Sequence, residues 1–173
     1  VEDDPAMRLY LMESVPPRDW YEERPGRWIV EPQWPAPEIA PTTLKLGAEL
    51  LRDTAEQQLP ITFASPQDCG MAGGEYCAIW LGPDLPGDQR DDDARSLCFD
   101  MEIAEPLDLV GGAFVTLVVS ADRPTGMVAA RLCDVTHDGA STRVTYGVFN
   151  LCHRTGHENP QRLVPGEEYE ITL

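Results

Sequence analysis

The chain has 173 residues, and its 13 Lys and Arg against 30 Asp and Glu give a formal net charge of −17 at pH 7. Such a charge repels phosphate backbones and anionic lipid headgroups, so neither nucleic acid nor a membrane surface is an expected partner. The apolar runs are only a few residues long, far below the ~20 residues that cross a bilayer. The length fits a single domain with a hydrophobic core.

Proline and glycine recur along the whole chain, with 16 and 14 copies. They leave few stretches long enough for a helix of about 12 residues. The one helical candidate is 47–59, where Leu50, Leu51 and Leu59 fall near a period of 3.6 and Pro60 ends the pattern.

Stretches rich in β-branched and aromatic residues are the stronger signal, and several alternate apolar with polar residues. Glycine-containing turns separate them. Short strands joined by such turns are typical of a two-sheet antiparallel β-sandwich or jelly roll. The predicted strands are 7–12, 28–30, 96–100, 114–120, 127–135, 143–148 and 168–173.

The N-terminal part differs in texture, because three tryptophans stand among many prolines. We expect 1–41 to form the first strand and a long wrapping loop, and 42–173 to supply the sandwich strands of one domain. Trp20, Trp28 and Trp34 are predicted to cover the outside of a sheet or a neighbouring domain. The alternative is an aromatic platform that binds a ligand.

The five cysteines are an odd number at irregular spacings. This argues against a secreted disulfide framework and favours the cytoplasm. Cys98 and Cys133 have apolar neighbours and are predicted to be buried thiols. A loop disulfide between Cys69 and Cys77 is the alternative use of two others.

No serine is flanked by the glycine pair of a Gly-x-Ser-x-Gly elbow, which holds a nucleophile on a strained turn beside oxyanion donors. The chain is therefore predicted to contain no catalytic residue. The serines are Ser14, Ser65, Ser96, Ser120 and Ser141.

Two of the three histidines, His153 and His157, are four residues apart, a spacing that suits zinc on a helix. Gly156 and Pro160 argue against a helix there. A solvated loop is therefore predicted, with no metal and no cofactor, although Cys152 lies next to the pair in sequence.

Acidic residues gather at 91–93, after Asp84 and Asp88. Calcium takes 6–8 oxygen ligands, but the spacing of an EF-hand loop is missing here. We predict a solvated acidic loop, partly paired with Arg90 and Arg95, and keep calcium as the alternative.

A series of motifs follows a fixed order along nearly the whole chain. It begins with 7–12 and Trp20, and its most specific part is 82–97, with Asp-Gln-Arg at 88–90. The later members are 103–111, 120–124, 130–139, 145–147 and 165–169. This order resembles the C-terminal domain of the CocE/NonD hydrolases and X-prolyl dipeptidyl peptidases.

The resemblance implies a galactose-binding-like jelly roll, with 44–59 extended rather than helical. It also implies a serine hydrolase of esterase, acylase or X-Pro dipeptidyl-peptidase type, whose upstream α/β-hydrolase domain and helical cap carry the active site. This chain would pack on those domains, help to wall the site and be inactive alone. The family sandwich continues beyond 165–169 with further strands, so a truncated sheet with an open edge is expected, which favours a homodimer.

In the family the segment 73–82 approaches the active site, which makes Tyr76, Ile79 and Trp80 candidates for the pocket wall. Packing between domains is the simpler explanation of the same side chains. A structural ion-pair network, rather than substrate binding, is the expected role of three charged residues: Asp88, Arg90 and Arg95.

A carbohydrate- or ligand-binding module is the competing hypothesis, because such sandwiches often bind sugars through aromatic side chains at loop tips. Its candidates are Trp28, Trp34 and Trp80. The substrate cannot be read from the chain under either hypothesis, because no nucleophile is present.

Overall fold

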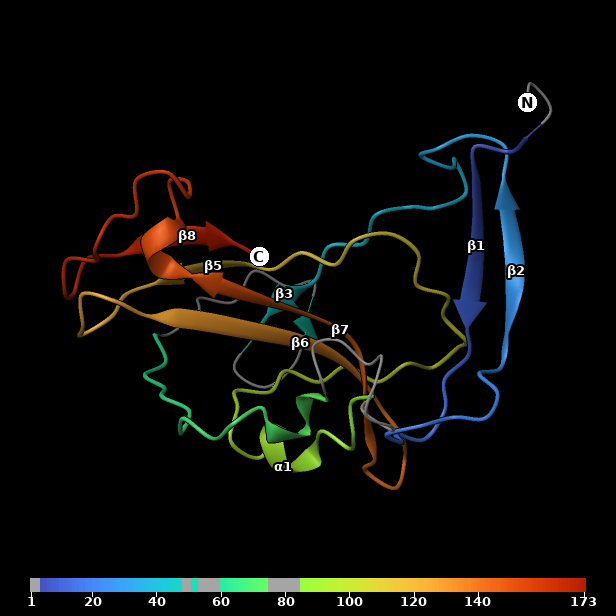
Figure 1. Ribbon diagram of the computed structural model, residues 1–173, viewed down its shortest axis with the longest axis horizontal. Coiled ribbons are helices and arrows are strands. Elements are labelled where there is room, and N and C mark those ends of the chain that lie inside the picture. Colours follow the sequence, from blue (N-terminus) through green and yellow to red (C-terminus); the bar gives the residue numbers. More distant parts are fainter. Residues whose placement is uncertain (1–3, 48–50, 53–59, 75–84) are drawn as a thin grey trace. The chain divides into compact units, whose positions relative to one another are not determined.

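The computed structural model describes residues 4–47, 51–52, 60–74 and 85–173. The elements, in chain order, are β1 (Met7–Met12), β2 (Gly26–Glu31), β3 (Lys45–Leu46), β4 (Leu51–Arg52), the 3-10 turn η1 (Met71–Gly73), α1 (Arg90–Asp93), β5 (Thr116–Val119), β6 (Met127–Val135), β7 (Ser141–Asn150), the 3-10 turn η2 (Leu151–His153) and β8 (Tyr169–Thr172) (Figure 1). The prediction of an antiparallel all-β chain is confirmed. Within the described ranges, no helix has the length and apolar character needed to span a membrane.

Contacts divide the chain into two compact units. Unit 1 comprises Val1–Val110 with Thr136–Thr142, and unit 2 comprises Gly111–Val135 with Arg143–Leu173. The expectation of one domain over residues 1–173 stays a prediction.

In unit 1, β1 and β2 form an antiparallel ladder in which Tyr10 lies opposite Trp28. Their rings meet edge to face, with centroids 5.3 Å apart, and the Tyr10 hydroxyl donates to the carbonyl of Arg24 at 2.9 Å. Side chains alternate between half-buried and exposed along β1, as the sequence pattern predicts. Gly26 is required in this ladder, because an added Cβ would lie 2.4 Å from the carbonyl oxygen of Leu11.

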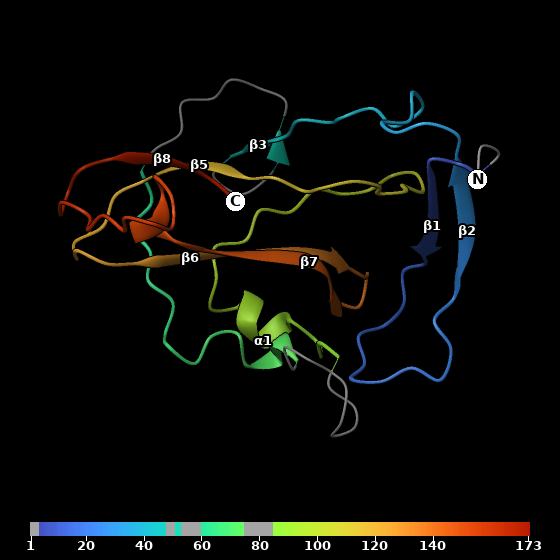
Figure 2. The same ribbon diagram turned by 45° about the horizontal axis from the view of Figure 1, so that its top comes forward.

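In unit 2, two ribbons of two strands, β5 with β8 and β6 with β7, supply one hydrophobic core (Figure 2). Leu151, Leu163 and Ile171 are buried at its centre. All four strands contribute to the packing around them, through Leu117, Val119, Val128, Phe149 and Tyr169. Unit 2 is therefore a small sandwich, whereas the closed jelly roll stays a prediction.

Most predicted strands occur, and β6 has the predicted bounds. The strand predicted at 96–100 is wrong, because the turn after α1 extends to Ser96 and residues 97–99 are not in a strand. The N–H groups of Arg95 and Ser96 donate to the carbonyls of Asp92 and Asp93, which leaves them unable to pair in a ladder. Only an isolated bridge at Asp100 remains.

The described part of 47–59 contains the short strand β4 and not a helix. β3 pairs antiparallel with β4, so 45–46 and 51–52 are extended, as the family resemblance implied. Residues 48–50 and 53–59 lie outside the described residues.

The two thiols predicted to be buried differ in their surroundings. Cys133 is half-buried, but Cys98 is exposed, so the prediction is wrong for Cys98. It follows the turn after α1 instead of lying in a strand, and its apolar neighbours Leu97 and Met101 are exposed as well.

We expect Ile171→Ala to lower the free energy of unfolding by about 3 kcal/mol, because it leaves a cavity in the core of unit 2. Val118→Ala is the matched control, since Val118 is 63% exposed on the neighbouring strand, and should cost less than about 0.5 kcal/mol. Urea unfolding followed by circular dichroism measures both. Equal losses in the two variants would contradict this core assignment.

Candidate functional site

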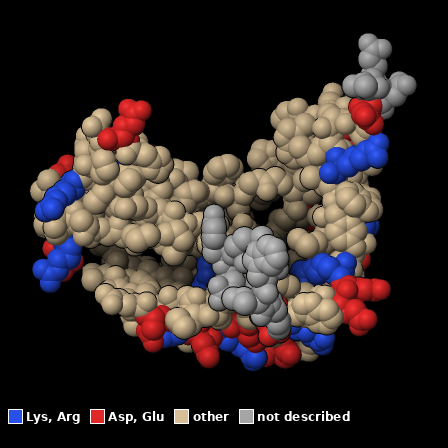
Figure 3. All heavy atoms as spheres, viewed as in Figure 1, with Lys and Arg blue, Asp and Glu red and all other residues tan. Residues whose placement is uncertain are grey.

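Charged side chains of both signs gather around α1 in unit 1 (Figure 3). This helix is one turn long and begins directly after Gln89, whose carbonyl accepts from the N–H of Asp93 at 2.8 Å. The sequence pattern predicted a loop here, because four residues are too few to carry helical periodicity. The short helix positions one carboxylate, Asp92, for burial.

The carboxylate of Asp92 is 1% exposed and collects several donors. Its Oδ1 accepts from the N–H of Gly70 at 2.8 Å, and its Oδ2 accepts from the N–H of Ala72 at 3.1 Å. Nη2 of Arg95 lies 3.1 Å from Oδ1. A buried charge is tolerated only when it is paired and hydrogen-bonded in this way. The expectation that 91–93 is a solvated acidic loop is therefore wrong for Asp92.

Gln89 is fully buried and joins three segments of the chain. Its Nε2 donates to the carbonyls of Ala72 and Gly87, both at 2.8 Å. Its backbone N–H donates to the carbonyl of Ser141 at 2.9 Å. A side-chain amide can serve two carbonyls at once because it has two N–H donors.

Asp88 and Arg90 form an ion pair beside this amide. Nη2 of Arg90 lies 2.7 Å from Oδ2 of Asp88, and Nε donates to the same oxygen at 2.9 Å. Oδ1 of Asp88 accepts from the backbone N–H groups of Arg90 and Ser141 at 3.1 and 3.2 Å. Burial opposes ionisation of Asp88, but these hydrogen bonds outweigh it and hold the pKa of its carboxyl below the usual value.

Arg95 belongs to a second ion-pair group. Besides Asp92, it contacts Asp68, with Nη1 3.2 Å from Oδ2, and its Nε donates to the carbonyl of Asp91 at 3.1 Å. The structure thus places Asp88 with Arg90, and Arg95 with Asp92 and Asp68. We call Asp88, Gln89, Asp92 and Arg95, with their partners, the anchor.

The anchor joins the two flanks of the segment 75–84. The carbonyl of Ala72, before that segment, accepts from both the N–H of Gly87 at 3.1 Å and the side chain of Gln89, after it. Tyr76, Ile79 and Trp80, expected at the pocket wall, lie outside the described residues.

Sequence reasoning missed Gln89 and Ser141. Both are buried, and the hydroxyl oxygen of Ser141 has no hydrogen-bond partner within the described ranges. The Asp-Gln-Arg motif pointed to the right place, but it did not show that the middle residue is buried more deeply than its charged neighbours.

The tryptophans of the N-terminal part are exposed, by 59% for Trp20, 69% for Trp28 and 42% for Trp34. Trp28 contacts Tyr10 across the β1–β2 ladder, whereas Trp80 lies outside the described residues.

No three His, Cys, Asp or Glu side chains in the described part of the chain come together as metal ligands. The same is true of the described residues of the acidic stretch, for which calcium binding was the alternative hypothesis. Cys69 has a free thiol, and Cys77, the partner considered for it in a loop disulfide, lies outside the described residues. Sγ of Cys69 lies 3.7 Å from the hydroxyl of Ser96, beside the anchor.

We expect Asp92→Asn to lower the free energy of unfolding by about 3 kcal/mol, because it removes a buried charge and turns an N–H donor toward other donors. Asp91→Asn is the matched control: the same charge change one residue away, on an exposed side chain, with an expected cost below about 0.5 kcal/mol. Urea unfolding measures the difference. Equal effects would show that the carboxylate of Asp92 is not the centre of the anchor.

We expect Asp88→Asn to lower stability only while the native carboxyl is ionised. The lowered folded-state pKa means that this contribution is complete above the unfolded pKa of about 3.9 and is lost as pH falls through the folded pKa. Urea unfolding at a series of pH values should therefore show a constant gap from the native chain between about pH 5 and pH 7. The gap should close at lower pH.

Asp122→Asn is the control for this pH series. Asp122 is 88% exposed and lies 3.8 Å from Arg123, so it should give a gap close to zero at every pH. A gap for Asp88→Asn that persists at the most acidic pH would contradict the role given to its charge.

Residues 1–173 match the family described as the X-Pro dipeptidyl-peptidase C-terminal non-catalytic domain. The chain is also similar to a cocaine esterase of Rhodococcus sp. (strain MB1 Bresler). The two are 26% identical over an alignment of 184 residues, gaps included, which covers 98% of this chain. It spans about 30% of the length of that relative. No solved structure matches the chain. The resemblance carried by the ordered motifs is thereby confirmed, and the chain belongs to the family of X-Pro dipeptidyl-peptidase C-terminal non-catalytic domains.

Proposed function

We propose that the chain is the non-catalytic domain of a serine hydrolase and that it packs on an α/β-hydrolase domain and its cap. The observation that carries this proposal is the anchor. It ties Ala72 to Gly87 and Gln89, and so holds the two flanks of 75–84 together. The family resemblance implies that 73–82, most of which lies between these flanks, approaches the active site.

The anchor suits a supporting role, because its polar groups are directed at the chain itself. The oxygens of Asp92 accept from two backbone N–H groups and from Arg95, and the amide of Gln89 donates to two carbonyls. Groups satisfied in this way fix a loop but have little capacity left for a substrate. Asp88, Arg90 and Arg95 therefore act as structural ion pairs, and Tyr76, Ile79 and Trp80 contribute to the pocket wall.

The parent enzyme is proposed to cleave an ester or an amide bond through an acyl-enzyme, with its serine nucleophile outside residues 1–173. The family and the relative point to different substrates, since the family is named for X-Pro dipeptides and the relative for an ester. Homodimerisation of the chain stays a prediction.

A serine-directed phosphonate should label the intact parent enzyme once, and peptide mapping should place the label outside residues 1–173. Labelling should abolish hydrolysis of p-nitrophenyl acetate or Ala-Pro-p-nitroanilide, and the substrate that is turned over faster identifies the type of enzyme. The serines of this chain act as internal controls and should remain unmodified.

Label on Ser14, Ser65, Ser96, Ser120 or Ser141 would overturn the non-catalytic assignment. Neither labelling nor hydrolysis in the parent would favour the competing hypothesis of a carbohydrate-binding module. The exposure of Trp28 and Trp34 supports that alternative, because sugars stack on accessible aromatic rings.

A further inference from the structure

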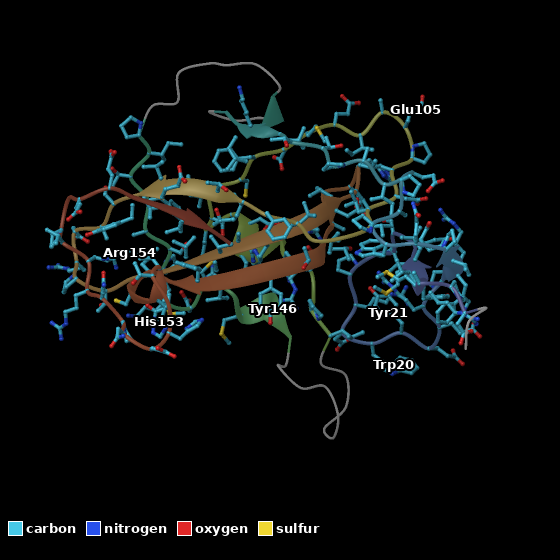
Figure 4. All side chains as sticks on the ribbon, turned by 90° about the horizontal axis from the view of Figure 1, so that it is seen from above. Trp20, Tyr21, Glu105, Tyr146, His153 and Arg154 are labelled. Atoms are coloured by element: carbon cyan, nitrogen blue, oxygen red, sulfur yellow. The ribbon has the colours of Figure 1, made fainter. Side chains whose placement is uncertain are left out.

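Two imidazole rings converge at the turn that follows β7 in unit 2. Nδ1 of His153 lies 2.8 Å from Nδ1 of His157, and the ring centroids are 4.9 Å apart. His153 stands at the end of η2, next to Arg154 (Figure 4). The spacing of these histidines suits a shared ligand when they lie on a helix, but here a tight turn brings the two rings together.

The turn is held by its own backbone. The N–H of Gly156 donates to the carbonyl of His153 at 3.0 Å, and Gly156 has φ +130°, a region that favours glycine. On the other side, the side chain of Asn150 caps η2 by accepting from the N–H of Cys152 at 3.0 Å. These hydrogen bonds therefore fix the backbone from which both imidazole side chains extend.

Arg154, between the two histidines in sequence, is engaged at the base of the turn. Its Nη1 donates to the carbonyls of Leu151 and Gln161 at 3.2 and 2.7 Å. Its guanidinium carbon lies 4.3 Å from the ring centroid of Tyr169. These contacts stabilise the turn and occupy the guanidinium of Arg154, the residue after His153.

The distance between the two Nδ1 atoms is short enough for both to bind one ion. With metal–nitrogen bonds of about 2.0–2.1 Å, nitrogens 2.8 Å apart subtend an angle of about 86° at a shared metal. A tetrahedral angle would need a separation of about 3.4 Å with the same bonds. Angles near 90° belong to square-planar and tetragonal sites, which Cu²⁺ and Ni²⁺ prefer.

We propose that His153 and His157 bind one Cu²⁺ or Ni²⁺ ion through their Nδ1 atoms. Since the described residues offer no third His, Cys, Asp or Glu at the site, water completes the coordination. His157 also lines a surface hollow with Asn159 and Gln161, which leaves its ring accessible to water. The net charge of −17 raises the local concentration of cations. The proposal replaces the sequence-based expectation of no metal.

Proton balance follows from the hydrogen bond between the rings. One Nδ1 must carry a proton and the other must accept it, so the pair of neutral rings holds one proton between the two nitrogens that would bind the ion. When the ion binds, that ring keeps its proton on Nε2 instead, and both rings remain neutral ligands.

The test is titration of the purified protein with Cu²⁺ at pH 7.5, after accessible thiols have been alkylated with iodoacetamide. Electron paramagnetic resonance should report one tetragonal Cu²⁺ per chain with two nitrogen ligands. His153→Gln and His157→Gln should each weaken binding roughly 100-fold, because the second ligand binds at high effective concentration. His137→Gln removes the third histidine, in unit 1, and should change nothing.

Binding equal to that of His137→Gln in either variant would overturn the proposal, as would tighter binding of Zn²⁺ than of Cu²⁺. Circular dichroism checks that the variants fold. If they do not, nitrogen-detected NMR of the unsubstituted protein decides. Ni²⁺ should perturb the Nδ1 signals of His153 and His157 but not those of His137, and equal or absent perturbation would refute the site.

Discussion

A carboxylate can be buried only where the surrounding groups replace the water it gives up. Asp92 is such a carboxylate, and the arrangement of η1, α1 and the turn after it depends on that requirement. Two backbone N–H groups and one guanidinium converge on it. The pairs Arg8 with Asp4 and Arg123 with Asp122 are far more exposed, and pairs of that kind contribute little to stability. The number of acidic residues, 30 in this chain, therefore does not show which of them contribute to stability.

The sequence was informative where side chains alone decide the structure. Residues 127–135 are mostly apolar and lie between glycine-containing turns, so β6 could be predicted with its bounds. The same reasoning failed at 96–100, where apolar residues suggested a strand but the backbone hydrogen bonds of Arg95 and Ser96 are used in a turn. A local composition signal cannot reveal that competition, because the competing acceptors are main-chain carbonyls.

The candidate site could be located from its motif but not understood from it. The triplet Asp88, Gln89 and Arg90 suggested charge pairing, and the Asp88–Arg90 pair is present. The buried roles of Gln89 and Asp92 depend on backbone partners at Gly70, Ala72 and Gly87. Backbone groups are the same in every residue, so no pattern in the sequence marks them as partners. The convergence of His153 and His157 was not predicted for a related reason, since it depends on a turn rather than on a repeating period.

The contacts of Asp92 enclose less chain than the pairing of β5 with β8. Asp92 reaches Gly70 across 22 residues, whereas the hydroxyls of Thr116 and Thr172 meet across 56. The entropy of closing a loop grows with the logarithm of its length, which makes the shorter closure easier by about 0.8 kcal/mol. The contacts of Asp92 therefore require less long-range organisation than the pairing of β5 with β8. A nascent chain has Gly70, Ala72, Asp92 and Arg95 available once Arg95 has been synthesised, before either β5 or β8 exists.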